Sequence, residues 1–133
     1  MTALAPPMDT RILALQSRML AMPEHQIAIP PRHTFAHGLY AREVTLPAGS
    51  TAIGFRHAQE HICIISQGRV QVVTEDGAEE IAAPATLVVP AGRKNCVHAI
   101  EETVWTTIHA SDAQTPDEAF AALVMPEEIL CLS

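Results

Sequence analysis

Positive charge is scarce in this chain of 133 residues, which has 15 acidic and 8 basic residues and a net charge of -7 at pH 7. Sequence-independent binding of nucleic acid depends on neutralising phosphates with Lys and Arg, so a nucleic-acid partner is not expected. Long apolar runs are also lacking, and Met1 to Pro7 has no basic segment followed by a continuous apolar one. We therefore expect a soluble, unsecreted protein without a membrane partner.

Cysteine and aromatic residues are few. The three cysteines Cys63, Cys96 and Cys131 show no CxxC spacing, so neither a disulfide framework nor a thiolate zinc knuckle is indicated. Aromatic residues make up 4% of the chain against 48% for all apolar types, so Ala, Val, Ile and Leu must fill the core. A chain of this length buries enough surface to fold as one domain. This composition favours a compact barrel or sandwich.

Short extended segments separated by Pro and Gly turns dominate the middle of the chain. The Asp76-Gly77 pair is a strong hairpin signal because both residue types tolerate positive φ values. Many short strands at regular spacing are typical of an antiparallel barrel or a double-sheet jelly roll. We predict strands at residues 39–46, 51–57, 61–66, 69–74, 78–82, 86–89, 96–100 and 103–109.

Helices are predicted at both ends. Asp9 can cap a helix that Pro23 ends, and Thr115 to Glu118 forms a capping box for a second, short helix. The expected organisation is one domain, with an N-terminal helix and extended arm at 1–38, a barrel at 39–110, and a C-terminal helix and tail at 111–133. The apolar faces of the helices and the exposed edges of a small jelly roll predict a homo-oligomer.

Three of the seven histidines can meet if the strands close into a barrel. His57 ends one predicted strand, His61 begins the next, and His98 follows the Pro90-Ala91-Gly92 turn. Three neutral imidazoles suit a divalent transition metal such as Fe, Zn, Ni or Mn and leave coordination positions open. The alternative is a set of hydrogen-bonded polar side chains at the barrel mouth. His109, at the end of the last predicted strand, has no assigned role.

Period-two alternation predicts a ligand pocket around these histidines. If His61 faces inward then so does Cys63, and if His98 faces inward then so does Cys96. Phe55 is expected beside them. The two cysteines act either as small apolar fillers or as redox or ligand groups.

Two basic residues lie in the turn beside the predicted mouth. Arg93 and Lys94 could draw a carboxylate or phosphate into the pocket. The alternative is that they are solvated turn charges. A small anionic ligand is therefore one of the expected partners.

These motifs resemble those of the cupin superfamily, whose members form small metal-binding β-barrels. Phe55 stands where cupins usually carry the first histidine of the first motif, and His61 stands where glutamate is common. The residues that carry the resemblance are Gly49, His57, His61, Gly68, Asp76-Gly77, Pro90-Ala91-Gly92 and His98. A longer set of segments resembles small cupin proteins encoded by tailed bacteriophages and prophages. These are Ala21–Pro23, His33–Ala36, Leu39–Glu43, Leu46–Gly49, Thr74–Gly77 and Thr103–His109.

The resemblance implies an all-β, cupin-type jelly-roll barrel with short terminal helices. It implies a non-enzymatic virion or accessory module in which the three histidines hold a metal ion or nothing. The module would be located in the bacterial host cytoplasm or in the virion, with other phage proteins as partners. One alternative is a metal-dependent oxygenase, isomerase or lyase acting on a small polar molecule, with Glu43 or Glu60 moving protons. Another is a sensor of a small ligand, because one fold hosts many functions.

Overall fold

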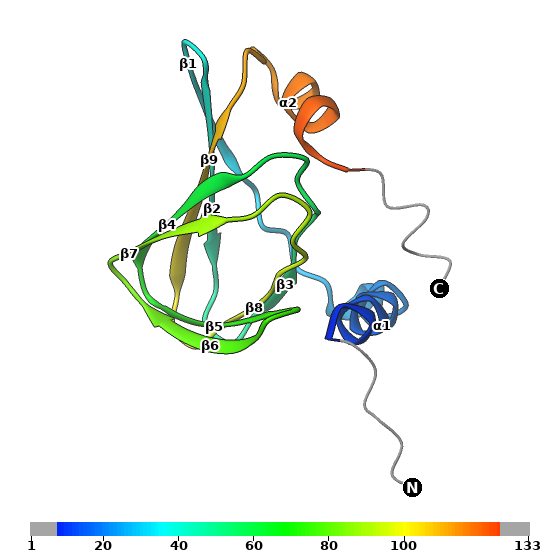
Figure 1. The fold of residues 1–133 in the computed structure, drawn as a ribbon. Coiled ribbons are helices and arrows are strands. Elements are labelled where there is room, and N and C mark those ends of the chain that lie inside the picture. The colour runs from blue at the N-terminus through cyan, green and yellow to red at the C-terminus, as the bar shows by residue number, and fades with distance from the viewer. Residues whose placement is uncertain (1–7, 126–133) are drawn as a thin grey trace, which may run out of the picture.

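Two antiparallel sheets form the body of the protein in the computed structural model, which describes residues 8–125 (Figure 1). The five-stranded sheet has the order β1-β2-β9-β4-β7, and the four-stranded sheet has the order β3-β8-β5-β6. The strands are β1 Arg32–Ala36, β2 Leu39–Leu46, β3 Thr51–Ile53, β4 His61–Gln67, β5 Arg69–Thr74, β6 Gly77–Ala82, β7 Ala85–Val89, β8 Cys96–Ala99 and β9 Thr103–Ala110. The predicted all-β barrel is confirmed.

Two helices and one short 3-10 turn accompany the sheets: α1 at Met8–Leu20, η1 at Pro23–His25 and α2 at Pro116–Leu123. Asp9, the expected cap, lies inside α1. Residues 1–7 of the N-terminal segment and 126–133 of the tail, with Cys131, lie outside the described residues. Within 8–125, neither helix is long and apolar enough to cross a bilayer.

Two segments differ from their predicted structure. The strand expected at 51–57 ends at Ile53, which lies opposite Cys96, the first residue of its partner β8. Beyond this point Phe55 is half exposed. The arm before β2 contains an unpredicted strand, β1, which pairs with β2 along its whole length.

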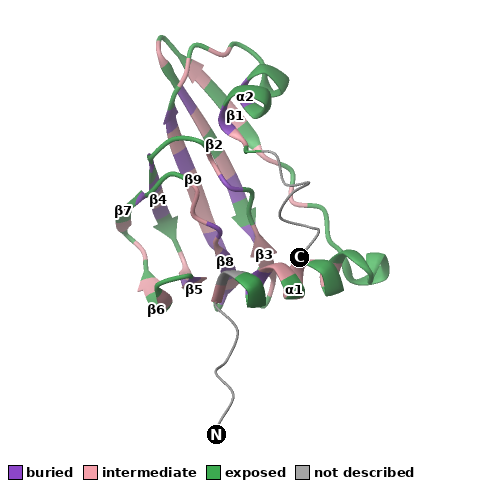
Figure 2. Ribbon diagram, turned by 45° about the vertical axis from the view of Figure 1, so that its right-hand side comes forward, coloured by how far each residue is buried: buried purple, intermediate pink, exposed green. Residues whose placement is uncertain are grey.

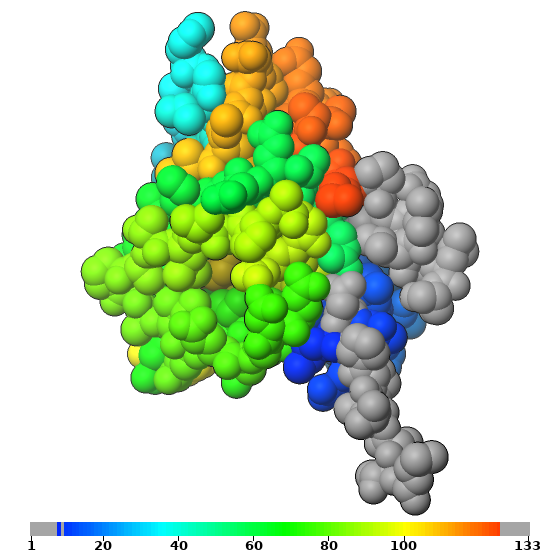
Figure 3. Space-filling view, viewed as in Figure 1, coloured from blue at the N-terminus to red at the C-terminus, as the bar shows by residue number. Residues whose placement is uncertain are grey.

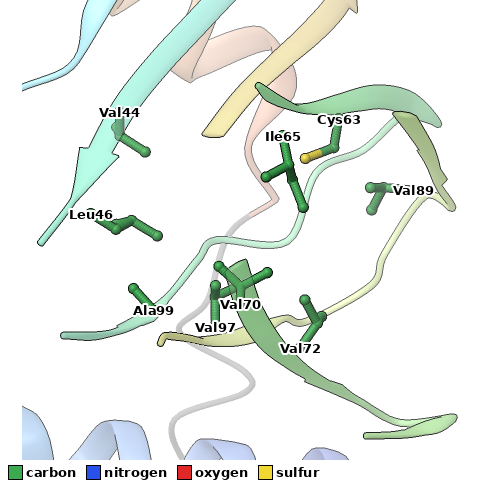
Figure 4. Close-up of a cluster of buried hydrophobic side chains, with 9 residues drawn as sticks. All are labelled: Val44, Leu46, Cys63, Ile65, Val70, Val72, Val89, Val97 and Ala99. Atoms are coloured by element: carbon green, nitrogen blue, oxygen red, sulfur yellow. The ribbon is translucent and has the colours of Figure 1, made fainter. Parts of the chain in front are cut away.

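The main core lies between the two sheets and is built from alternate residues of their strands (Figure 4). Aliphatic side chains dominate it, as the shortage of aromatic residues predicted. Buried residues follow the strands, and few lie on the helices (Figure 2). The core residues are Val44, Leu46, Cys63, Ile65, Val70, Val72, Val89, Val97 and Ala99.

A second, smaller core attaches α2 to the barrel. Ala119 and Leu123 of α2 are buried against Tyr40 of β2. The capping box is confirmed, because the Glu118 amide donates to Thr115 Oγ1 at 3.2 Å and the Gln114 amide donates to Glu118 Oε2 at 2.9 Å. As a result α2 covers the end of the barrel where β1, β2 and β9 project (Figure 1).

We predict that Gly68→Ala strongly destabilises the fold. Gly68 has a φ of +92°, and a Cβ there would lie 2.2 Å from the Glu102 carbonyl oxygen and 2.8 Å from Thr103 Cα. Backbone atoms cannot rotate away, so we expect a loss on the order of 3 kcal/mol in urea unfolding. Gly49→Ala is the matched control: Gly49 has a φ of +83°, but a Cβ there would have no atom within 4 Å, so the variant should lose only about 1 kcal/mol. Equal losses would contradict the packing argument.

Candidate functional site

Strand register brings two histidines into one row on the inner face of the five-stranded sheet. Tyr40 of β2 lies opposite His109 of β9. The pairing of β9 with β4 continues this row to His61, and His61 in turn lies opposite Val89 of β7. Because side chains in one row share a face, the rings of His109 and His61 are neighbours, with centroids 4.4 Å apart.

A third histidine, His57, reaches the same place from the loop between β3 and β4. Its backbone forms an isolated β-bridge with Val124, just after α2, and its carbonyl accepts from the Gly92 amide at 2.8 Å. Its ring centroid lies 4.7 Å from that of His61 and 4.9 Å from that of His109. We call His57, His61 and His109 the histidine cluster.

Burial keeps the cluster unprotonated at neutral pH. His61 and His109 are only 6% and 2% exposed. The pKa of His109 falls to about 3, mainly through burial and then through proximity to His61, His57 and Arg42. The pKa of His57 falls to about 4, mainly through burial and then through His61 and Arg42. Burial also lowers the pKa of His61. Neutral imidazole is the form that binds metal ions.

Hydrogen bonds leave one nitrogen free on each of the two strand histidines. His61 Nδ1 lies 3.2 Å from the Gln59 carbonyl oxygen, which can only accept, so Nε2 keeps the lone pair. His109 Nε2 lies 2.9 Å from Thr107 Oγ1, and its buried Nδ1 has no hydrogen-bond partner. Metal-binding histidines commonly use their second nitrogen in this way, which fixes the ring orientation.

The imidazole nitrogens of the histidine cluster suit a divalent transition metal, although the three rings do not point to one common position. The rings of His61 and His109 are inclined by only 33°. Among residues 8–125, no group of three or more His, Cys, Asp or Glu side chains is already arranged to hold an ion. Coordination by the histidine cluster would require small rotations of its rings that keep the contacts of His61 with Gln59 and of His109 with Thr107, and the terminal torsion of histidine has broad energy wells.

The structure does not bring His98 to the histidine cluster. His98 lies on β8 in the other sheet, where its Nδ1 is 2.9 Å from Thr51 Oγ1. The core side chains of β8 are Val97 and Ala99, so Cys96 and His98 point to the opposite face. The inward orientation expected for Cys96 and His98 is therefore wrong.

His109 is the member of the histidine cluster that was not predicted as a ligand, although the sequence contains a signal for its orientation. Trp105, Thr107 and His109 alternate along β9, and Trp105 packs against the main core. An inward Trp105 places His109 on the same face, four residues further along the strand. Trp105, the single tryptophan of the chain, thus indicates which side chains of β9 point inward.

The other residues of the predicted pocket do not gather around the cluster. Cys63 faces inward as expected, but it is fully buried in the main core, where burial raises its pKa to about 12. Burial also raises the pKa of Cys96. Both thiols therefore stay protonated, which suits small apolar fillers. Phe55 instead meets Phe120 of α2 edge to face, at 5.3 Å between centroids.

Arg93 lines a cavity of about 320 Å³ that lies among β5, β6, β7 and β9 and contains no histidine. Figure 3 looks onto the green and yellow-green strands that border it. Asp76 forms an ion pair with Arg93, so an entering anion would have to displace this carboxylate. Lys94 is buried, with 1% of its surface exposed, and is not a solvated turn charge.

No protein-family model matches the sequence, and no curated protein matches it. Solved structures do match the fold. A cupin superfamily protein from Desulfitobacterium hafniense is 12% identical, with a TM-score of 0.55 over 66% of this chain and 82% of that one. A cupin-2 domain protein from Shewanella frigidimarina is 16% identical, with a TM-score of 0.53 over 78% and 99%. Ectoine synthase from P. lautus is 10% identical, with a TM-score of 0.56 over 64% and 65%.

These similarities show the fold and no more, because the identities are low. The protein has a cupin-type jelly-roll barrel with a helix at each end, as the cupin resemblance implied. The structural neighbours include proteins named as cupins and one named as an enzyme. They do not show the more specific resemblance to phage-encoded cupins.

We predict that the metal-free protein loses stability in acid. Unfolded histidine has a pKa of about 6.5, whereas folded His57 and His109 have values of about 4 and 3. The unfolded chain therefore binds more protons below pH 6.5, and stability falls as pH falls towards 4, by up to about 1.4 kcal/mol per pH unit for each group. Urea unfolding between pH 7 and 5 measures this fall.

His109→Gln should make the same fall shallower, because one proton fewer is taken up on unfolding. Cys96→Ala is the control, since it alters a buried residue outside the histidine cluster and should change stability similarly at both pH values. A slope unaffected by His109→Gln would contradict the assignment.

Proposed function

We propose that this protein is a small cupin that binds one divalent transition metal ion at the histidine cluster. The observation that carries the proposal is the buried Nδ1 of His109, which has no hydrogen-bond partner and belongs to a ring that lies beside those of His57 and His61. An unsatisfied buried polar atom costs about 1–3 kcal/mol. A bound ion would remove that cost, and Fe, Zn and Ni suit three imidazoles better than Mn does.

The residues around the histidine cluster would prepare it for an ion. The Gln59 carbonyl and Thr107 hydroxyl hold His61 and His109 by their second nitrogens. Tyr40 stacks beside His109, at 5.9 Å between centroids, and α2 packs on Tyr40, so water is excluded from that side. A bound metal with three protein ligands would supply Lewis-acid chemistry at its open positions.

Acidic side chains give little support to an enzymatic mechanism. Glu43 is on the face of β2 opposite Tyr40 and pairs with Arg32 at 3.5 Å, so it is not placed to move protons at the cluster. Glu60 is exposed, and no carboxylate contributes to the lowered pKa of any cluster histidine. This favours a metal-binding module over the oxygenase, isomerase or lyase alternative.

A virion or accessory role in a tailed phage rests on sequence resemblance alone and stays a prediction. Mass spectrometry of purified virions tests it, and absence of the protein from virions would remove the virion version. The expected homo-oligomer likewise stays a prediction, which light scattering of the full chain tests.

We predict that protein purified without a histidine tag binds one equivalent of a transition metal ion. His109→Ala removes a ligand and should weaken metal binding more than tenfold. His98→Ala should leave metal binding unchanged, because His98 lies in the other sheet. Elemental analysis after equilibration with Zn²⁺ and desalting measures both. Loss of metal in His98→Ala but not in His109→Ala would show that His98, and not His109, is the ligand. Less than about a tenth of an equivalent of metal in the wild type would exclude a metal site at the histidine cluster.

A further inference from the structure

We infer that the outer face of the five-stranded sheet, which points away from the main core, is the contact surface for a second copy of this chain. Such a dimer would form with or without a metal ion at the histidine cluster. The homo-oligomer expected from the sequence placed the contact at strand edges and helix faces. The structure points instead to the broad face of one sheet.

An apolar row crosses this outer face from strand to strand. Cys63 of β4 lies in the main core, so its neighbours Ile62 and Ile64 point outward. Ile62 lies opposite Ile108 of β9 on one side and opposite Val88 of β7 on the other. Pairing of β9 with β2 extends the row by one more residue. The row is Val88, Ile62, Ile108 and Ala41.

Neither helix covers this row. Val88 is 61% exposed and Ile62 is 42% exposed. The helix α2 packs on Tyr40, whose side chain is on the inner face, and α1 contacts β5 of the other sheet. An antiparallel sheet with one solvated face usually presents polar side chains to water, and a contiguous exposed apolar patch commonly marks an interaction site.

The four-stranded sheet shows what an outer face with polar side chains looks like in the same molecule. Val70 and Val72 of β5 lie in the main core, so Arg69 and Gln71 point outward. Arg69 forms an ion pair with Glu80 of β6 at 3.8 Å. The apolar row on the five-stranded sheet is therefore not a general property of this barrel.

Charge favours a second copy at this face. Among the outward side chains of the five strands, which all lie within residues 32–110, Arg32 and Glu43 are the charged ones, and they pair with each other at 3.5 Å. The chain as a whole has a net charge of -7, so two copies repel each other over most approaches. A face without net charge allows a second acidic copy to approach and bury apolar surface on both sides.

The size of the face is sufficient for a reversible dimer. Five strands about 4.8 Å apart and about 20 Å long offer roughly 500 Å² of sheet per copy. Two copies would then bury roughly 1,000 Å², which is the lower limit for a specific interface. We therefore expect a dimer that dissociates on dilution, with a dissociation constant in the micromolar range or weaker.

Sedimentation velocity of the full, untagged chain from about 5 µM to about 500 µM tests this dimer. We expect the wild type to change from monomer to dimer within this range. Val88→Lys and Ile62→Lys would each bury an unpaired charge at the contact and should weaken dimerisation at least about tenfold. Both side chains already face water in the monomer, so urea unfolding should change little. Val88→Thr keeps the β-branched shape and should weaken dimerisation less.

Ile27→Lys is the matched control, because Ile27 is 56% exposed, precedes β1 and lies outside the sheet. It adds the same charge and should leave the dissociation constant unchanged. A wild type that stays monomeric at every concentration would leave the face to a different partner and overturn the inference. A dimer that resists both lysine variants at the sheet, or that Ile27→Lys weakens equally, would overturn it as well.

Discussion

Side-chain alternation along paired strands is the constraint on which the histidine cluster depends. Across the inner face of the five-stranded sheet, the row that contains His109 and His61 lies next to a row that contains Thr107 and Cys63, and a third row contains Trp105 and Ile65. The inner face thus changes from polar to apolar over a few residues. A shift of one residue in register would turn every one of these side chains to the other face of the sheet.

The sequence predicted most of the fold because local signals and tertiary structure agree. The Asp76-Gly77 hairpin, the capping box at Thr115 and the alternation that turns His61 and Cys63 inward each follow from a few neighbouring residues. The strand β8 was different. Its two alternating sets are Cys96 with His98 and Val97 with Ala99, and each set contains a small apolar residue. Polarity favours the wholly apolar set, Val97 with Ala99, as the inward one, and packing in the main core follows it; the interpretation of His98 as a metal ligand led to the opposite choice.

The cluster itself depends on contacts that no local pattern contains. His57 reaches it through a loop whose backbone is held by the segment after α2, where the Ala58 amide donates to the Leu123 carbonyl at 2.7 Å and the Met125 amide donates to the Arg56 carbonyl at 2.8 Å. The neutral state of the imidazoles is likewise a product of tertiary burial, since the same residues in an unfolded chain would titrate near pH 6.5. The sequence could identify imidazole as the chemistry of the site, but it identified only His57 and His61 of the three histidines.

The way in which α2 is attached allows its sequence to change during evolution without disturbing the barrel. The helix closes one end of the barrel, yet it is joined to the wall near His57 through main-chain hydrogen bonds, which almost any side chain can preserve. Exchanges on the solvent side of α2 and in the connection at 111–115 can therefore reshape the approach to the histidines while the barrel interior stays unaltered. Among related chains we expect variation to concentrate in this closing segment, so that one conserved barrel could acquire different selectivities.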